Sequence, residues 1–269
     1  MADDIHAAMV DIYCKELKMP GLRKAYASLA REAIQNGQSM VQYLAGCLAE
    51  ELESRKQSRL QTYTRQARFP TYKTLQDFDF AAIPALSKQR VLHLAEGEFI
   101  RNKENVICMG ASGTGKTHVA IAIGMAAIAA GYRVRFITVM QLVQELLQAE
   151  SEYRLPRYLR TWDKYDLVCL DELGYVSLSQ GGPLLFQFCA DRYEKGSLLI
   201  TTNLEFAKWT DVFHDVTLTT ALLDRLTHHS HILLFEGESY RFRESQRKTI
   251  NENLRRNGDE LHETRNPAV

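Results

Sequence analysis

The sequence predicts an α/β protein in which a small helical module precedes a parallel, doubly wound sheet. From Lys88 onward, five short apolar runs alternate with helical stretches, and strands separated by helices form parallel sheets. The runs read NVICM, YRVRFI, LVCLD, SLLIT and HILLF. A second observation is the glycine-rich stretch GASGTGKT, which follows the first run directly. A third is the start of the chain, which is helical in pattern and lacks strand-like alternation as far as Arg68.

Four regions follow from these patterns. We expect a helical N-terminal module over residues 1–68, a linker over 69–87, the α/β core over 88–243 and a charged tail over 244–269. In the helical module, Ser39 and Gln42 have the spacing of a capping box at the start of a helix. Four apolar residues share one face of that helix: Val41, Leu44, Leu48 and Leu52. Pro70 marks the start of the linker.

Composition and charge exclude several classes of protein. With 45% hydrophobic residues, 25% charged residues and a formal net charge of zero, the chain has the make-up of a soluble globular protein without an overall attraction to nucleic acid or membrane. The longest uncharged apolar run, near Val119 to Ala130, is too short to span a bilayer, and the acidic start does not resemble a secretory signal. We therefore expect a cytoplasmic protein. The five cysteines include no CxxC pair, which favours buried thiols over disulfides or zinc ligands.

The glycine-rich stretch matches the phosphate-binding loop G-x-x-x-x-G-K-[ST] between a strand and a helix. Its backbone N–H groups and the following helix N-terminus favour phosphate binding. Lys116 should reach the β- and γ-phosphates of ATP, and the Thr117 hydroxyl should bind Mg²⁺. The expected nucleotide-binding residues are Gly110, Ala111, Ser112, Gly113, Thr114, Gly115, Lys116, Thr117 and His118.

Polar residues follow two of the later apolar runs. Asp171 ends the third run, where it would hold Mg²⁺ through water, and Glu172 would polarise an attacking water. Because a kinase needs no base for water, this acid pair favours ATP hydrolysis over phosphate transfer to a small molecule. The fourth run ends in Thr201, Thr202 and Asn203, which either sense the γ-phosphate or simply form a turn.

Basic residues form further candidate sites. Arg225 lies in a stretch with a helical pattern, where it either pairs with Asp224 or reaches the nucleotide of a neighbouring subunit as an arginine finger. Two basic stretches either bind DNA phosphates or form solvated surface, and in the second a helix places Arg157 and Arg160 beside Tyr158 and Trp162. Their basic residues are Arg55, Lys56, Arg59, Arg65, Arg68 and Lys73 in the first, and Arg154, Arg157 and Arg160 in the second.

Several motifs taken in order resemble the IstB-type transposition helper proteins, which are AAA+ ATPases related to DnaC-type helicase loaders and DnaA-type initiators. The resemblance covers nearly the whole chain and is most specific in DELGYVSLSQ and LLDRLTHHSHI; it also includes GASGTGKT, SLLITTN and ESYRFRES. It implies an AAA+ core with strand order 5-1-4-3-2, Asn203 as the sensor-I residue, Arg225 as the arginine finger and Arg241 as a sensor-II-like arginine. The residues beyond Arg241 are too polar to form a full C-terminal lid.

The resemblance also implies partners. Such proteins bind duplex DNA without strict sequence preference, assemble on it with ATP into homo-oligomers that bend it, and assist a partner transposase. A replicative helicase loader of the DnaC type shares every nucleotide-binding residue and remains the alternative, together with a monomeric P-loop kinase.

Overall fold

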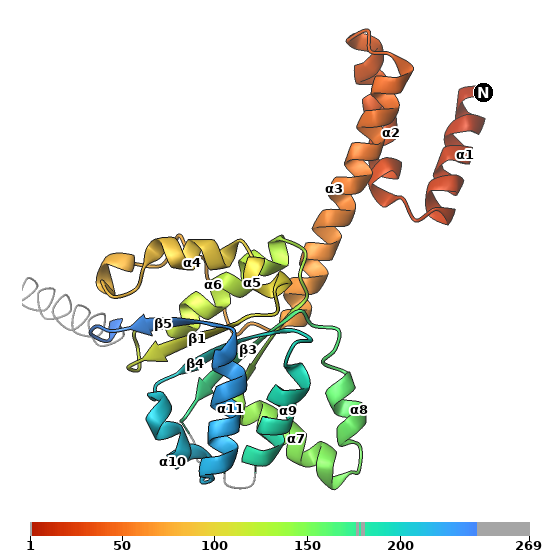
Figure 1. The fold of residues 1–269 in the computed structure, drawn as a ribbon. Helices are drawn as coiled ribbons and strands as arrows, with labels where there is room; N and C mark the ends of the chain where they lie inside the picture. The colour runs from red at the N-terminus through yellow and green to blue at the C-terminus, as the bar shows by residue number, and fades with distance from the viewer. Residues whose placement is uncertain (1, 176–177, 179–180, 241–269) are drawn as a thin grey trace, which may run out of the picture. The chain divides into compact units, whose positions relative to one another are not determined.

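The chain folds into two compact units, Met1–Arg65 and Gln66–Val269. The structure is a computed structural model that describes residues 2–175, 178 and 181–240 (Figure 1). Arg241 and the expected tail lie outside the described residues, and so does the part of the chain from which a lid would be built. Among the described helices, none combines the length and the apolar character needed to cross a bilayer.

The N-terminal unit contains α1 (Ala2–Glu16), α2 (Pro20–Gln35) and most of α3 (Met40–Ala67). The buried Glu51 of α3 caps α2, because its carboxylate accepts hydrogen bonds from the backbone N–H groups of Gly21 (2.7 Å) and Leu22 (3.2 Å). Gly21 permits this approach, since a Cβ there would lie 2.7 Å from the carbonyl oxygen of Glu50. Arg55 donates to Glu51 across 2.6 Å. Burial alone would raise the pKa of Glu51, but the hydrogen bonds from Arg55 and α2 outweigh it and lower the pKa below its ordinary value.

The start of α3 has the capping box that the sequence predicts. The Ser39 N–H donates to Oε1 of Gln42 (2.8 Å), and the Gln42 N–H donates to Oγ of Ser39 (3.3 Å). The apolar face that begins there remains at the surface, with 45% of the Leu48 side chain and 77% of Val41 exposed. Three helices alone can cover little apolar surface, and they bury small side chains such as Cys14, Ala33 and Cys47 instead.

The core unit is built on five parallel strands in the order β2-β3-β4-β1-β5. This is the order 5-1-4-3-2 read from the other edge, so the expected AAA+ core is confirmed. The three central strands are almost wholly buried, which explains their uninterrupted apolar sequences. The strands are β1 (Asn105–Gly110), β2 (Val134–Thr138), β3 (Leu167–Leu173), β4 (Ser197–Thr202) and β5 (Ser230–Phe235).

Helices cover both faces of this sheet (Figure 1). One face carries α4 (Lys88–Ala95), α5 (Glu98–Arg101) and α6 (Lys116–Ala129), and the other carries α7 (Val139–Ser151), α9 (Gly182–Arg192) and α11 (Val216–His228). Two short helices, α8 (Leu155–Arg160) and α10 (Trp209–Phe213), extend that second layer, whose apolar residues form one continuous cluster with the sheet. All five cysteines are buried and unpaired, as the sequence predicts, and burial raises the pKa of the Cys108 thiol to about 12.

The segment 69–87, which the sequence suggests is a linker, packs on the core unit. The ring of Phe69 lies 5.8 Å from that of Phe136 on β2, and the side chains of Ile83 and Leu86 are buried. A single turn of 3₁₀ helix, η1 (Phe80–Ala82), lies within the segment. The sequence contains the apolar residues that cause this packing, but prolines and polar residues interrupt them. The segment is therefore one wall of the core and not a spacer.

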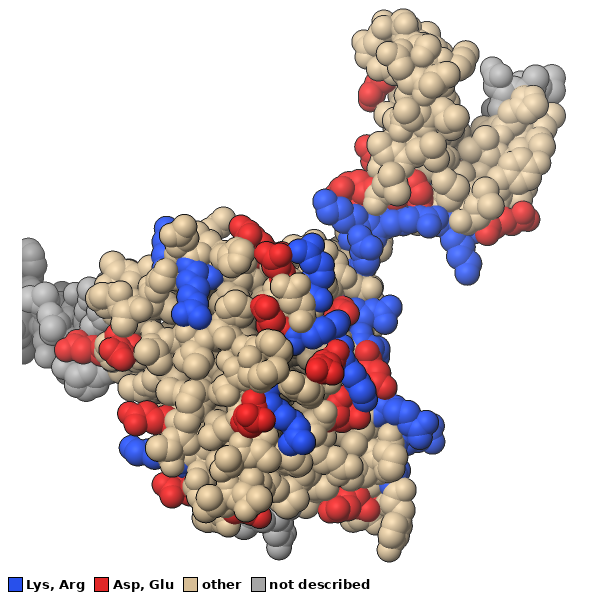
Figure 2. Space-filling view, viewed as in Figure 1, with Lys and Arg blue, Asp and Glu red and all other residues tan. Residues whose placement is uncertain are grey.

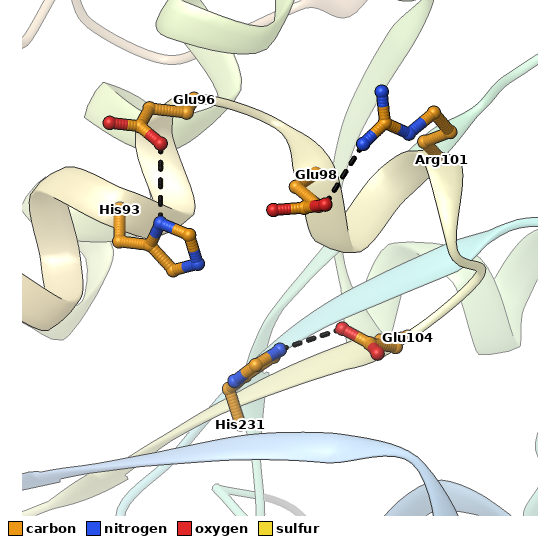
Figure 3. A network of polar contacts seen from close by, with 6 residues as sticks. All are labelled: His93, Glu96, Glu98, Arg101, Glu104 and His231. Atoms are coloured by element: carbon orange, nitrogen blue, oxygen red, sulfur yellow. Dashed lines mark hydrogen bonds and ion pairs between the residues drawn. The ribbon is translucent and has the colours of Figure 1, made fainter.

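Polar contacts join the elements at the amino edge of the sheet. The side chain of Asn105 accepts from the Leu198 N–H (2.9 Å) and donates to the carbonyl oxygen of Leu226 (3.3 Å). His231 at the start of β5 lies 2.8 Å from the carboxylate of Glu104, close to the surface pairs that His93 and Arg101 form with neighbouring acids (Figure 3). The contacts of Asn105 and His231 join distant segments at the edge that lies opposite the phosphate-binding loop.

Candidate nucleotide-binding site

The glycine-rich loop connects the carboxyl end of β1 to the amino end of α6. Gly110 ends the strand and Lys116 begins the helix, so the N–H groups of the first turn of α6 face the loop. Gly115 caps the helix with a φ of 93°, and a Cβ there would lie 2.6 Å from the ring of Phe78. A glycine is needed at this position for both reasons. The expected strand, loop and helix are therefore present, with the geometry of a phosphate cradle.

The side chain of Lys116 lies over the loop. Its Nζ donates to the carbonyl oxygens of Gly110 and Ala111, each across 2.7 Å, and only 7% of the residue is exposed. The hydroxyl of Thr114 donates to the same Ala111 carbonyl oxygen (2.8 Å). The ammonium group therefore lies where a phosphate in the cradle would meet it, and a bound phosphate would compete with two carbonyl oxygens for its protons.

The two acids at the end of β3 have different surroundings. Asp171 is buried, and its Oδ1 accepts hydrogen bonds from the hydroxyls of Thr117 (2.9 Å) and Thr201 (2.5 Å). Glu172 is exposed, has a φ of 66°, and lines the cavity above the loop. The structure thus brings together the hydroxyl and the carboxylate expected to serve Mg²⁺, and the chemistry of both groups fits a cation that prefers oxygen ligands.

A cavity of about 410 Å³ covers the loop, and the segment 69–87 forms one of its walls. The sequence did not indicate this wall. Lys73, which we expected among the DNA contacts, lines the cavity, as do several apolar side chains. The lining residues beyond the loop and the acids are Thr71, Lys73, Asp77, Phe78, Asp79, Ala82, Ile83, Ile121, Tyr175, Thr201, Thr202 and Tyr240.

His118 connects this wall to α6. Its Nε2 lies 2.8 Å from the carbonyl oxygen of Thr74, and its ring meets the ring of Phe78 edge-on at 5.3 Å. His118 also lines the cavity. On the opposite side, the Tyr240 N–H donates to the carbonyl oxygen of Gly113 (2.9 Å). Segments on both sides of the loop therefore hold it in place.

Of the three remaining candidates, the structure describes Asn203 and Arg225, and neither lines the cavity. Asn203 does not belong to the described residues that line the cavity, and its buried Oδ1 has no hydrogen-bond partner among them. Arg225 lies on α11 near the amino edge of the sheet, where its guanidinium is 5.0 Å from the ring centroid of Phe186 and donates to the carbonyl oxygen of Ala221 (3.4 Å). Arg241 falls outside the described residues.

In the first basic stretch, some side chains contact residues of their own unit and others are exposed. Arg55 is bound to Glu51 and to the carbonyl oxygen of Lys18, and Lys56 lies 4.0 Å from Glu53. On the face of the N-terminal unit that Figure 2 shows, basic side chains gather at one end with acidic ones beside them. Arg59, Arg65 and Arg68 are exposed, and Arg68 lines a second cavity of about 690 Å³ that adjoins both acids of β3.

The second basic stretch presents its arginines at the surface, and its aromatic residues pack toward the core. Arg157 and Arg160 on α8 are exposed, and Arg154 just before it pairs with Glu152. The two aromatic residues expected beside these arginines pack inward. Trp162 is 4% exposed and packs on Phe188, and the Tyr158 hydroxyl donates to the carboxylate of Glu145. Both aromatic residues are needed in the core beneath α7.

Comparisons with known proteins identify the family and a similar fold. The model of a family described as IstB-like ATP binding protein matches residues 12–248. A protein of insertion sequence IS5376 from Geobacillus stearothermophilus, designated ATP-binding, is 38% identical over 87% of this chain and 94% of its own length. The corresponding protein of IS21 from Pseudomonas aeruginosa is 38% identical over 90% of this chain and 91% of its own length. In fold, the crystal structure of DnaI is similar with a TM-score of 0.52 at 17% identity, over 61% of this chain and 91% of that one.

Proposed function

The chain belongs to the family of IstB-like ATP-binding proteins, and from this premise we propose that it is an ATPase that assembles on duplex DNA and assists a transposase. The observation that carries the proposal is the meeting of the phosphate cradle with Thr117, Asp171 and Glu172 at one edge of the sheet. Neither the cradle nor the acids alone would indicate hydrolysis. Together they supply the groups that an NTPase needs.

ATP binding follows from the cradle. The loop N–H groups and Lys116 would hold the phosphates, and the cavity wall with Phe78 and Ile83 offers an apolar surface for the base. Thr117 and Asp171 would hold Mg²⁺, which neutralises the charge on the phosphate oxygens when it is bound. No other described pair of residues joins a hydroxyl of the loop to a carboxylate in this way.

Glu172 is the best candidate for the group that polarises water. Its carboxylate is exposed at the cavity, whereas that of Asp171 is buried and occupied by two hydroxyls. An exposed carboxylate beside the γ-phosphate can accept a proton from an attacking water. This difference between adjacent acids favours hydrolysis over the kinase alternative, which has no use for Glu172.

The position of Arg225 supports an assembly. This residue lines a small pocket with Asn105 and Leu198, which lie at the starts of β1 and β4, while the cradle lies at the carboxyl ends of the strands. A six-residue strand separates these edges by roughly 15–20 Å. Arg225 therefore lies too far away to serve the nucleotide of its own chain. As an arginine finger it would complete the site of a neighbouring copy, so that ATP links the two.

The DNA and transposase roles rest on kinship and on local charge. The relatives with 38% identity are proteins of insertion sequences, which favours a transposase over a replicative helicase as the partner. Exposed arginines such as Arg59, Arg65, Arg157 and Arg160 would supply phosphate contacts that carry no sequence information. Capture of a transposase by the chain, and not of a hexameric helicase, tests this choice; the reverse result would make the chain a helicase loader.

The variant Glu172→Gln tests the ATPase directly. We expect it to bind ATP with unchanged affinity, to hydrolyse it at least about 100-fold more slowly, and to remain on duplex DNA longer than the wild type. Lys116→Ala should fail to bind ATP and to assemble. Glu96→Gln, which removes a surface acid directly after α4, is the matched control and should retain wild-type rates. Rapid hydrolysis by Glu172→Gln, measured as phosphate release, would contradict the proposed role.

A further inference from the structure

A β-bulge lies at the acid pair. Along β3 and β4, Leu170 pairs with Ile200 and Leu173 pairs with Thr202, so Asp171 and Glu172 together face the single residue Thr201. Such a bulge takes one residue out of the ladder and redirects its side chain. Here Glu172 adopts a φ of 66°, a backbone conformation that residues other than glycine rarely adopt without support. A group near the bulge must therefore stabilise it.

The hydroxyl of Thr201 supplies that support. Its oxygen accepts a hydrogen bond from the Glu172 N–H (2.9 Å), and its proton is donated to Oδ1 of Asp171 (2.5 Å). The directions are fixed, because a backbone N–H can only donate and an ionised carboxylate can only accept. Thr201 is 2% exposed, so water does not readily replace it. One hydroxyl therefore holds the backbone of one acid and the carboxylate of the other.

We infer that Thr201 is a positioning residue for ATP hydrolysis: it fixes Glu172 in the left-handed conformation that directs its carboxylate to the cavity, and it orients Asp171 beside Thr117. This inference rests on the proposed ATPase function. It also assigns a role to β4 that differs from the expected role of Asn203, because the contact with the acids comes from a residue two positions earlier in the chain.

The test compares two substitutions that differ in one group. Thr201→Ser retains the hydroxyl, whereas Thr201→Val keeps the shape and loses it. We expect Thr201→Val to lower the kcat of ATP hydrolysis about 10- to 100-fold, since small displacements of a catalytic group have effects of this size. The affinity for a fluorescent ATP analogue should change less than about threefold, and Thr201→Ser should stay within about threefold of wild type in both. Thr219→Val is the control. Thr219 lies on α11, is also 2% exposed, and donates its hydroxyl proton to the backbone carbonyl oxygen of Asp215.

A second measurement does not depend on activity. Hydrogen exchange at the Glu172 N–H should be at least about tenfold faster in Thr201→Val than in Thr201→Ser or in the control, because only the valine removes its acceptor. If the wild type hydrolyses ATP and Thr201→Val matches its kcat, or if serine fails to rescue the loss, the inference is overturned. If the wild type hydrolyses no ATP, the proposed function fails. Separately, if the Glu172 N–H exchanges no faster in Thr201→Val than in the wild type, the inference that Thr201 positions Glu172 is overturned.

Discussion

Asp171 and Glu172 are neighbours in the chain, but their surroundings give them different chemistry. Asp171 is buried with two hydroxyl partners, so its carboxylate is held in one orientation. Glu172 is exposed at the cavity, where it can meet water. The sequence identified both residues from their position after an apolar run. The bulge that separates their roles depends on the register with β4, which no local pattern reveals.

Glu51 provides a test at the residue scale in the N-terminal unit. A Gln at this position has one acceptor oxygen instead of two, so it cannot accept from Arg55 and from the α2 N–H groups at the same time. We therefore expect the free energy of unfolding to fall by about 1–3 kcal/mol at pH 7. Urea unfolding of the full chain, followed by circular dichroism, measures this loss. Glu53→Gln, which changes an exposed acid two residues away, should have little effect.

The pH dependence of the same variant follows from the lowered pKa of Glu51. Because the folded pKa lies below the unfolded one, the stabilisation is present above about pH 4.3 and is lost as the pH falls through the folded pKa. The difference between wild type and Glu51→Gln should therefore shrink as the pH is lowered below about 4. A difference that grows on acidification would contradict the assigned hydrogen bonds.

Among the elements, the segment 69–87 departs most from expectation. It closes one side of the nucleotide cavity through Phe78 and is attached to α6 by His118. Its sequence resembles a linker because its apolar residues follow neither a helical nor a strand period. The strands, the loop and the acids could be predicted because each depends on local spacing. The wall of the cavity could not, since its contacts join residues about 40 positions apart.

The variant Phe78→Ala tests this wall. Removing the ring opens the cavity beside Gly115 and exposes the bound base to water, so we expect the affinity for ATP to fall about tenfold. Titration with a fluorescent ATP analogue measures the change. Tyr72→Ala, which removes an aromatic side chain that is 69% exposed in the same segment, should leave the affinity unchanged. Equal affinity in Phe78→Ala and wild type would show that the segment does not contact the nucleotide.

At the scale of the whole molecule, the cradle and Arg225 occupy opposite edges of one sheet. In the proposed assembly, each copy would offer its cradle at one edge and Arg225 at the other, and a row of copies would complete all but the last site. The residues alone leave Arg225 as either a partner of Asp224 or an arginine finger, and the family resemblance favours the finger. Its separation from the cradle depends on the sheet order, in which β5 follows α11 and lies beside β1.

Mixing two inactive variants tests the shared site. Arg225→Ala keeps its nucleotide pocket and lacks the finger, whereas Lys116→Ala lacks the pocket and keeps the finger. We expect each to hydrolyse ATP at least about 100-fold more slowly than wild type, and the mixture to recover activity well above the sum of the two. A mixture of Lys116→Ala with Glu172→Gln, both defective in the pocket, should recover none. Absence of recovery in the first mixture would show that Arg225 does not act on a neighbouring copy.

The most direct measurement of the central claim is the size of the complex on duplex DNA with each nucleotide. Analytical ultracentrifugation or electron microscopy of the wild type with DNA and a non-hydrolysable ATP analogue should show oligomers of several copies, and these should be absent with ADP. Arg225→Ala should remain monomeric with either nucleotide. A wild-type protein that stays monomeric on DNA with the ATP analogue would contradict the claim that ATP joins one copy to the next.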